Sequence, residues 1–335
     1  MDYELFEAGE VELQSGEVLP RAQLAYKVHG RLNHDRSNVV LYPTRYSGKH
    51  SDNEFLIGSG MALDPTKYFI VAPNLLGNGV SSSPTNTPPP CDRGNFPHVT
   101  IWDNVTLQRR LLEEKFGIER LALAVGWSMG GQQAYQWAAR YPDAVDRLAP
   151  ICGSARTSPH NYVFLEGMKA ALTADAGFAD GWYDEPPIRG LRAMGRAWAG
   201  WATSQAWFRL GIHRKMGYDT VDDFLVGYWE RLFLERDPNN LLALLWTWEH
   251  ADISANRIYK RDFERALSSI SARAIVMPGA TDLYFHVDDS AYEVEHMPKA
   301  QLRPIPSVWG HYAGSGRDPA ATKFINSALH ELLAA

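Results

Sequence analysis

Short apolar runs recur in the first half of the chain, and each of them ends at a proline or a glycine. Residues 39–42, 68–72 and 121–125 form three such runs. Runs of this length that stop at a turn residue are typical of buried strands. Between the last two, residues 103–115 place apolar side chains at helical spacing, with Asp103 as the expected N-cap. This alternation predicts a βαβ series with a mainly parallel sheet.

The same alternation continues on both sides of a long interruption. After Gly126 the pattern predicts a helix over residues 132–140 and a strand over residues 148–151. Much further along, strand-like runs return at residues 274–278 and 301–305, and a closing helix is expected from about residue 319 to 333. These elements extend the parallel sheet by at least three strands.

The interruption itself has a different character, because residues 154–266 contain long helical stretches and hardly any strand-like run. We therefore expect one sheet domain, formed by residues 1–153 and 267–335, with a helical cap inserted at residues 154–266. The inserted segment also holds seven of the 11 tryptophans, namely Trp182, Trp198, Trp201, Trp207, Trp229, Trp246 and Trp248.

Composition narrows the class of protein without identifying its function. The chain has 335 residues, of which 45% are hydrophobic and 21% are charged, so a large folded core is expected and disorder is excluded. The formal net charge is −6, with both signs scattered along the chain. Neither nucleic acid nor an anionic membrane is an expected partner, because both need a concentrated basic surface.

Cysteine usage and the first residues indicate a reducing compartment. Cys91 and Cys152 are too few for a disulfide framework and lack the spacing of a zinc site. The first ten residues are acidic, where a signal peptide is basic and then apolar, and no apolar run approaches the roughly 20 residues of a membrane span. We expect a cytoplasmic protein.

The chemistry of the chain centres on Gly126-Trp127-Ser128-Met129-Gly130, which lies where a predicted strand meets a predicted helix. A Gly-x-Ser-x-Gly motif in that context is typical of a nucleophile elbow, a tight turn that raises the serine hydroxyl above the sheet edge. The small residues at 126 and 130 let the strand and helix backbones approach each other. The competing interpretation is a tight turn with an incidental serine.

A serine hydroxyl needs a base, and candidates follow Ser128 in the order acid, then histidine. Asp282 comes just after the strand-like run at residues 274–278, and His311 follows the next one, so both are expected at the same sheet edge as Ser128. His311 would accept the serine proton, and Asp282 would hold the imidazole tautomer. Asp288 and Asp289 compete for the acid role, although first-turn helix charges are the simpler interpretation.

An ester carbonyl also needs two hydrogen-bond donors for its developing negative charge. The backbone N–H of Met129 is one candidate, at the start of the helix. The loop of residues 43–48, after an early strand, would supply the second donor from Arg45 or Tyr46. The sequence leaves the choice between these two open.

Other features are better explained without catalysis. His250 and Asp252 are spaced like metal ligands, but without a further cluster they are interpreted as surface or hinge residues. Residues 77–79 lack the rest of a phosphate loop and predict a turn. Arg192 and Arg196 recur at helical spacing in the inserted segment, where solvated side chains are the simpler interpretation, although either could meet an anionic substrate.

Several segments of the chain are similar to motifs of one known family, the homoserine O-acetyltransferases among the α/β hydrolases. The similar segments are residues 96–103, 126–134, 141–143 and 310–311. The resemblance implies an α/β-hydrolase fold, with a mainly parallel central sheet flanked by helices and an inserted helical cap. It also implies a triad of Ser128, Asp282 and His311, an acyl-enzyme on the serine and, in the true transferases, acetyl-CoA as the donor.

The positions at which this chain departs from the transferase motifs indicate that it is more similar to the esterases of the family. Transferases of the family have a glycine where this chain has Trp127, and they have His-Ala-Leu-Thr-Gly where it has residues 43–48. Their closing Gly-His-Asp-Ala-Phe contains an aspartate that helps to hold the homoserine amine, whereas Tyr312 follows His311 here. An ammonium group buried without a carboxylate partner is strongly disfavoured, so homoserine is not the expected substrate.

The sequence therefore predicts a serine hydrolase that cleaves small, largely uncharged acyl esters, acetates among them. The alternatives are an acetyl-CoA-dependent O-acyltransferase with a hydroxyl acceptor other than homoserine, a non-catalytic binding protein of the same fold, and a C–C bond or amide hydrolase of that fold, because a triad leaves the leaving group open. No metal or organic cofactor is expected, the partner is a small-molecule ester, and a homodimer is possible by analogy. Trp127, Trp309 and Tyr312 are expected to line an apolar, aromatic pocket between cap and sheet, although core packing is the simpler interpretation for single cap tryptophans.

Overall fold

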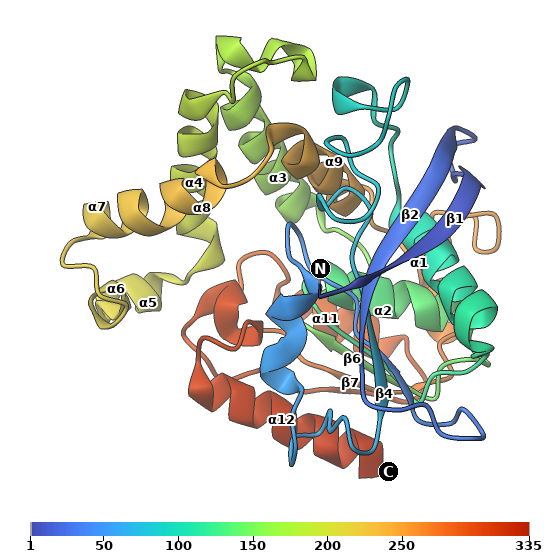
Figure 1. Ribbon diagram of the computed structural model, residues 1–335. Helices are drawn as coiled ribbons and strands as arrows, with labels where there is room; N and C mark the ends of the chain where they lie inside the picture. The colour runs from blue at the N-terminus through green and yellow to red at the C-terminus, as the bar shows by residue number, and fades with distance from the viewer. Residues whose placement is uncertain (1, 335) are drawn as a thin grey trace.

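The computed structural model describes residues 2–334 and contains one eight-stranded sheet with the strand order β1-β2-β4-β3-β5-β6-β7-β8 (Figure 1). β1 and β2 pair antiparallel with each other, and β2 pairs antiparallel with β4. All other pairs are parallel. The strands are β1 (Glu4–Glu12), β2 (Val18–His29), β3 (Val39–Leu41), β4 (Phe69–Pro73), β5 (Leu123–Trp127), β6 (Arg147–Ile151), β7 (Arg273–Val276) and β8 (Ala300–Leu302).

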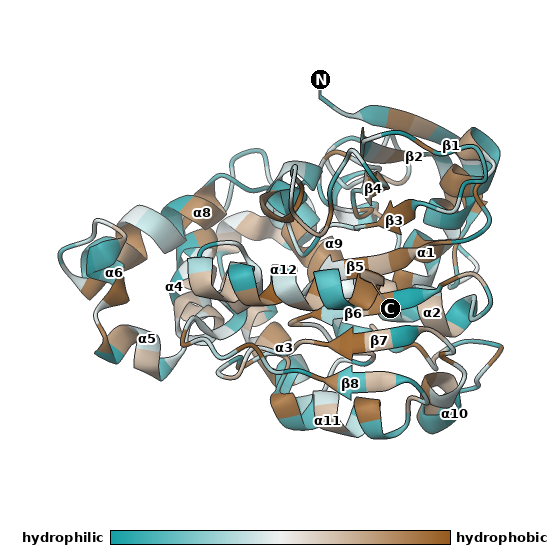
Figure 2. Cartoon of the chain, turned by 90° about the horizontal axis from the view of Figure 1, so that it is seen from below, coloured by the Kyte–Doolittle hydropathy of each residue, from teal (hydrophilic) through white to brown (hydrophobic). Residues whose placement is uncertain are grey.

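Helices cover both faces of this sheet, and the central strands are accordingly apolar on both sides (Figure 2). Alternate residues of β3 show the division: Val39 and Leu41 belong to one apolar core, and Val40 belongs to another. The first core contains side chains of α1 (Ile101–Arg110) and α2 (Met129–Arg140), and the second contains those of α12 (Pro319–Ala334). Strands buried on both faces read as continuous apolar runs, which is why the sequence indicated them.

The segment between β6 and β7 is helical, as its pattern suggested, and most of it extends away from the sheet (Figure 1). The last of its helices, α10, instead lies near α11 (Val287–Glu295) in Figure 2. The limits of the cap at residues 154 and 266 remain a prediction. The α-helices of the segment are α3 (Pro159–Thr173), α4 (Ile188–Ala202), α5 (Gln205–Arg209), α6 (Ile212–Lys215), α7 (Val221–Phe224), α8 (Arg231–Leu234), α9 (Pro238–Glu249) and α10 (Phe263–Ser268).

Two helix starts differ from the sequence-based prediction. The first is α1, which begins at Ile101 with Thr100 as its N-cap, so the assignment of Asp103 as the cap was wrong. Asp103 is the third residue of a capping box: its carboxylate accepts the Thr100 N–H at 2.8 Å, and its own N–H donates to the Thr100 hydroxyl at 3.2 Å. The second is α2, which begins at Met129, three residues earlier than expected.

The N-terminal strands β1 and β2 were not predicted. Buried and exposed residues alternate irregularly along β1, and its pairing with β2 shifts register around Gly9, which breaks the period of two that a regular strand presents. Among residues 2–334, no helix is both long enough and apolar enough to cross a membrane.

Candidate active site

Ser128 sits at the turn between β5 and α2 in a strained backbone conformation, with φ of 60° and ψ of −128°. The neighbouring glycines permit this turn. A Cβ on Gly126 would lie 2.2 Å from the carbonyl carbon and oxygen of Gly130, and a Cβ on Gly130 would lie 2.6 Å from the carbonyl oxygen of Pro43. Only glycine fits at either position, so the backbones of β5, α2 and the loop after β3 meet directly below the serine.

Ser128, His311 and Asp282 form a continuous hydrogen-bonded chain. His311 lies in the short helical turn after β8, with its Nε2 2.9 Å from the Ser128 hydroxyl oxygen and its Nδ1 2.8 Å from a carboxylate oxygen of Asp282. A carboxylate can only accept, so Nδ1 carries the proton and Nε2 is free to accept the serine O–H. The structure brings together the three residues that the sequence singled out.

The Asp282 carboxylate is held in place by its own loop after β7. Its other oxygen accepts the backbone N–H groups of Tyr284 at 2.8 Å and Phe285 at 3.3 Å, and the side chain has no exposed surface. The competing carboxylates, Asp288 and Asp289, lie in the first turn of α11. They are first-turn charges, and Asp282 is the carboxylate that contacts the imidazole.

The backbone N–H groups of Met129, Arg45 and Tyr46 have no acceptor among residues 2–334. The adjacent Thr44 N–H, by contrast, donates to the carbonyl oxygen of Pro73. Free N–H groups at a helix start and in the facing loop are what an oxyanion hole requires. The assignment of Met129 with Arg45 or Tyr46 remains a prediction, and the choice between the last two remains open.

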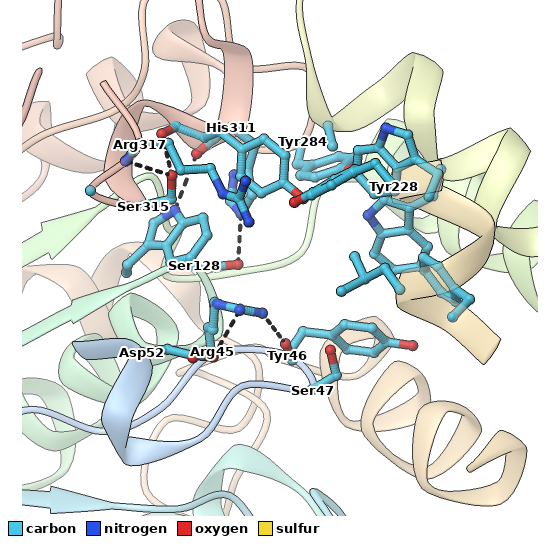
Figure 3. Close-up of a pocket in the computed structure, with 18 of the residues that line it drawn as sticks. Arg45, Tyr46, Ser47, Asp52, Ser128, Tyr228, Tyr284, His311, Ser315 and Arg317 are labelled. Atoms are coloured by element: carbon cyan, nitrogen blue, oxygen red, sulfur yellow. Dashed lines mark hydrogen bonds and ion pairs between the residues drawn. The ribbon is translucent and has the colours of Figure 1, made fainter. Parts of the chain in front are cut away.

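A cavity of about 370 Å³ opens above Ser128 between the sheet edge and the inserted helices (Figure 3). Much of its wall is aromatic. Trp127 and Tyr312 line it, and the inserted segment contributes Trp198, Trp229 and Trp248. Of the cap tryptophans that do not line it, Trp207 is fully buried in the core, whereas Trp182 is 47% exposed, so the cavity and core packing together account for only part of the aromatic excess.

Trp309 was wrongly expected in this pocket. Its ring packs on Trp207 of α5, edge to face, with the ring centroids 6.0 Å apart. Gly310 then turns the chain with φ of 59°, and a Cβ there would lie 2.9 Å from the carbonyl oxygen of Ala202. The tryptophan thus joins the sheet domain to the inserted helices, and only the residues after the turn face the cavity.

The cavity is less apolar than expected. Arg45, Asp52, Arg236 and Arg317 line it beside the aromatic rings. Sequence reasoning missed Asp52, Arg236, Arg317 and the pocket tyrosines Tyr228 and Tyr284, because no local pattern marks them and they converge only in the fold.

The arginines that the sequence did single out lie elsewhere. Arg192 and Arg196 pair with Glu230 on the inserted helices, at 3.4 Å for the Arg192 pair, and neither lines the cavity. The exposed ring of His250 stacks on Trp246 with centroids 3.9 Å apart. Asp252 accepts the N–H of Ser254 at 2.7 Å, so both residues of that pair make local contacts.

Comparison with known proteins places this fold and site in a family. A model of the alpha/beta hydrolase fold matches residues 39–311. The chain is an α/β hydrolase. The expected fold class, with a mostly parallel sheet between helices, is therefore confirmed.

Relatives of this α/β hydrolase include esterases and transferases. It is 42% identical over 334 residues to an ethyl acetate hydrolase of Pseudomonas veronii, covering 99% of this chain and 95% of that protein. It is 32% identical over 318 residues to a homoserine O-acetyltransferase of Nostoc punctiforme, covering 90% of this chain and 88% of that one. The solved structure of the acetyl esterase MekB superimposes with a TM-score of 0.97 at 41% identity, covering 99% of this chain and 97% of that one. The expected family resemblance, with greater similarity to esterases, and the expectation of an esterase-type enzyme are confirmed.

Proposed function

We propose that this α/β hydrolase is a serine carboxylic-ester hydrolase acting on small esters with short acyl groups, acetates among them. The observation that carries the proposal is the hydrogen-bonded chain Ser128–His311–Asp282, of which Ser128 and His311 line the cavity. Relatives named as an ethyl acetate hydrolase and an acetyl esterase support the substrate class.

The proposed reaction has two steps through an acyl-enzyme. Ser128 Oγ attacks the ester carbonyl carbon while His311 Nε2 takes its proton, and Asp282 stabilises the resulting imidazolium. The tetrahedral intermediate collapses by breaking the bond to the alkoxy oxygen, which leaves as the alcohol with the proton from His311. Water then attacks the acyl-enzyme, giving its proton to His311, and the acid leaves as that proton returns to Ser128.

The alternative is transfer of an acetyl group from acetyl-CoA to a hydroxyl acceptor, and the cavity disfavours homoserine as that acceptor. Where the transferases have an aspartate, the Tyr312 hydroxyl lies 3.2 Å from that of Tyr228. Asp52 is the one carboxylate among the residues that line the cavity, and Arg45 already pairs with it at 2.8 Å. The ammonium group of homoserine would find no free carboxylate there.

Hydrolysis of p-nitrophenyl acetate, with and without acetyl-CoA and candidate alcohols, tests the proposal. We expect release of p-nitrophenol in water alone and its loss in Ser128→Ala. Negligible release in water, with release only when a specific acceptor is added, would assign the protein to the transferases.

Covalent labelling tests a further alternative, a binding protein without turnover. A fluorophosphonate is expected to form a one-to-one adduct at Ser128, and His311→Ala is expected to lose it because the serine then lacks its base. If the wild-type protein is not labelled, the result would support the alternative that it binds a ligand without turnover.

A further inference from the structure

The charged residues that line the catalytic cavity are unbalanced. They comprise three arginines, Arg45, Arg236 and Arg317, and one acid, Asp52. Arg45 and Asp52 neutralise each other through their 2.8 Å ion pair. The cavity therefore retains the positive charges of Arg236 and Arg317, and Figure 3 shows Arg45 and Arg317 together with Ser128 in its wall.

Arg236 is half-buried and has only neutral partners. Its Nε donates to the Ser47 hydroxyl and one terminal nitrogen donates to the Leu232 carbonyl oxygen, both at 3.0 Å. Within residues 2–334, no carboxylate oxygen lies within 4.0 Å of its guanidinium group. Burial, and secondarily the charge of Arg45, lower the pKa of Arg236, and the nearby charge of Asp52 opposes them only in part. A guanidinium in this position gains most from an anion that enters the cavity, because desolvation of an unpaired charge is costly.

Arg317 adds a second cation, which lies over two phenol rings. Its guanidinium carbon lies 4.9 Å from the ring centre of Tyr228 and 5.2 Å from that of Tyr312, and no carboxylate of the described chain pairs with it. The two tyrosine hydroxyls are 3.2 Å apart. When one donates to the other, the accepting hydroxyl keeps its own proton free for a ligand. Cationic and hydroxyl donors thus line the same cavity.

We propose that Arg236 and Arg317, with the Tyr228–Tyr312 hydroxyl pair, form an anion subsite, and that the preferred substrates are esters carrying a carboxylate away from the scissile bond. This inference rests on the proposed ester hydrolysis and narrows its substrate class. Guanidinium groups bind carboxylates through charge-assisted and often bidentate hydrogen bonds, which a neutral alkyl ester cannot provide. The subsite also repels an ammonium group, which the same cavity has no free carboxylate to hold.

Matched esters of equal length test the subsite. The acetyl esters of γ-hydroxybutanoate and of its neutral amide place the charge in the alcohol half, and monoethyl succinate and ethyl succinamate place it in the acyl half. We expect the carboxylate member of at least one pair to exceed its amide by about tenfold in kcat/KM, mainly through a lower KM. The pair that shows the preference identifies the half of the substrate that faces the arginines. High salt is expected to reduce the preference, since part of the subsite is exposed.

Variants assign the preference to named residues. Arg236→Gln and Arg317→Gln are each expected to lower the ratio of carboxylate to amide several-fold, and Arg236→Lys to retain part of it. Arg231→Gln is the matched control, because that arginine lies on α8, is 75% exposed and pairs with Glu235 outside the cavity. The control should keep the wild-type ratio.

Two results would overturn the subsite. The first is that wild-type protein hydrolyses the amide-bearing ester of each pair with the same kcat/KM as the carboxylate-bearing ester. The second is that the preference for the carboxylate survives in the double variant Arg236→Gln/Arg317→Gln. Either result leaves the proposed function intact if p-nitrophenyl acetate is hydrolysed in a Ser128-dependent manner. If no ester at all is hydrolysed, the proposed function itself fails.

Discussion

The carboxylate of Asp282 lies 2.8 Å from Nδ1 of His311, and the side chain of Asp282 has no exposed surface. A buried carboxylate with a single imidazole partner fixes which ring nitrogen carries the proton. The orientation of His311 toward Ser128 therefore depends on an acid that follows a different strand.

Asp282→Asn is expected to reduce kcat for p-nitrophenyl acetate by about 10⁴-fold. The amide can donate to Nδ1, which moves the imidazole proton to Nε2, where it blocks acceptance of the Ser128 proton. Asp288→Asn, in the first turn of α11 with a 90% exposed side chain, is the matched control and should stay within about twofold of wild type. Activity of Asp282→Asn within tenfold of wild type would remove Asp282 from the proposed triad.

Gly126→Ala is expected to destabilise the protein by at least about 1–3 kcal/mol and to impair activity. Its Cβ would lie 2.2 Å from backbone atoms of Gly130, so the turn below Ser128 must shift. Urea unfolding measures the loss. Gly167→Ala is the control, because a Cβ on this exposed glycine of α3 would meet no atom within 4 Å, and it should gain up to about 1 kcal/mol from helix propensity. Equal midpoints for both variants would contradict the close packing of the elbow.

Glu293 of α11 is expected to make stability fall as pH rises. It is buried, accepts the Tyr135 hydroxyl and the Ala155 N–H at 2.7 Å each, and burial raises its pKa from the ordinary 4.5 to about 8. Between these two values the folded state keeps a proton that the unfolded state has lost, so the free energy of unfolding declines with pH up to about 8.

Glu293→Gln tests this origin of the pH dependence. An amide has the shape of the neutral acid and can donate to the Tyr135 hydroxyl, but it does not titrate. Urea midpoints at several pH values from 5 to 8 should decline less in the variant than in wild type. Parallel curves for the two proteins would show that Glu293 is not responsible.

The two cysteines are expected to differ in reactivity. Cys91 is partly exposed, whereas Cys152 is fully buried and burial raises the pKa of its thiol well above the usual range. Since the thiolate is the reactive form, iodoacetamide should modify native protein once, at Cys91, and leave esterase activity intact. Mass spectrometry reads the adducts, and Cys91→Ser should show none under native conditions. Rapid labelling of Cys152 in the folded protein would contradict its burial.

Much of the fold followed from local patterns. The runs at residues 39–42, 68–72 and 121–125 predicted β3, β4 and β5, because strands covered on both faces are apolar throughout. The strands β1 and β2 were not predicted, because a register shift breaks the alternation of buried and exposed residues along them. The N-cap of α1 was misplaced by three residues, because Thr100 and Asp103 both have side chains that can cap a helix and only their reciprocal hydrogen bonds decide between them.

By itself, the sequence determined where along the chain the residues of the proposed triad lie. Glycines at 126 and 130 allow the turn that presents Ser128, and parallel strands end at one edge, so Asp282 and His311 had to follow their strands to the same side as the serine. The tertiary structure alone decided the shape and charge of the cavity. Arg45, Arg236 and Arg317 come from three distant segments, and Trp309 turns away from the site that Tyr312 faces. Local periodicity specifies which elements form, whereas the side chains that meet depend on how loops and inserted helices pack together.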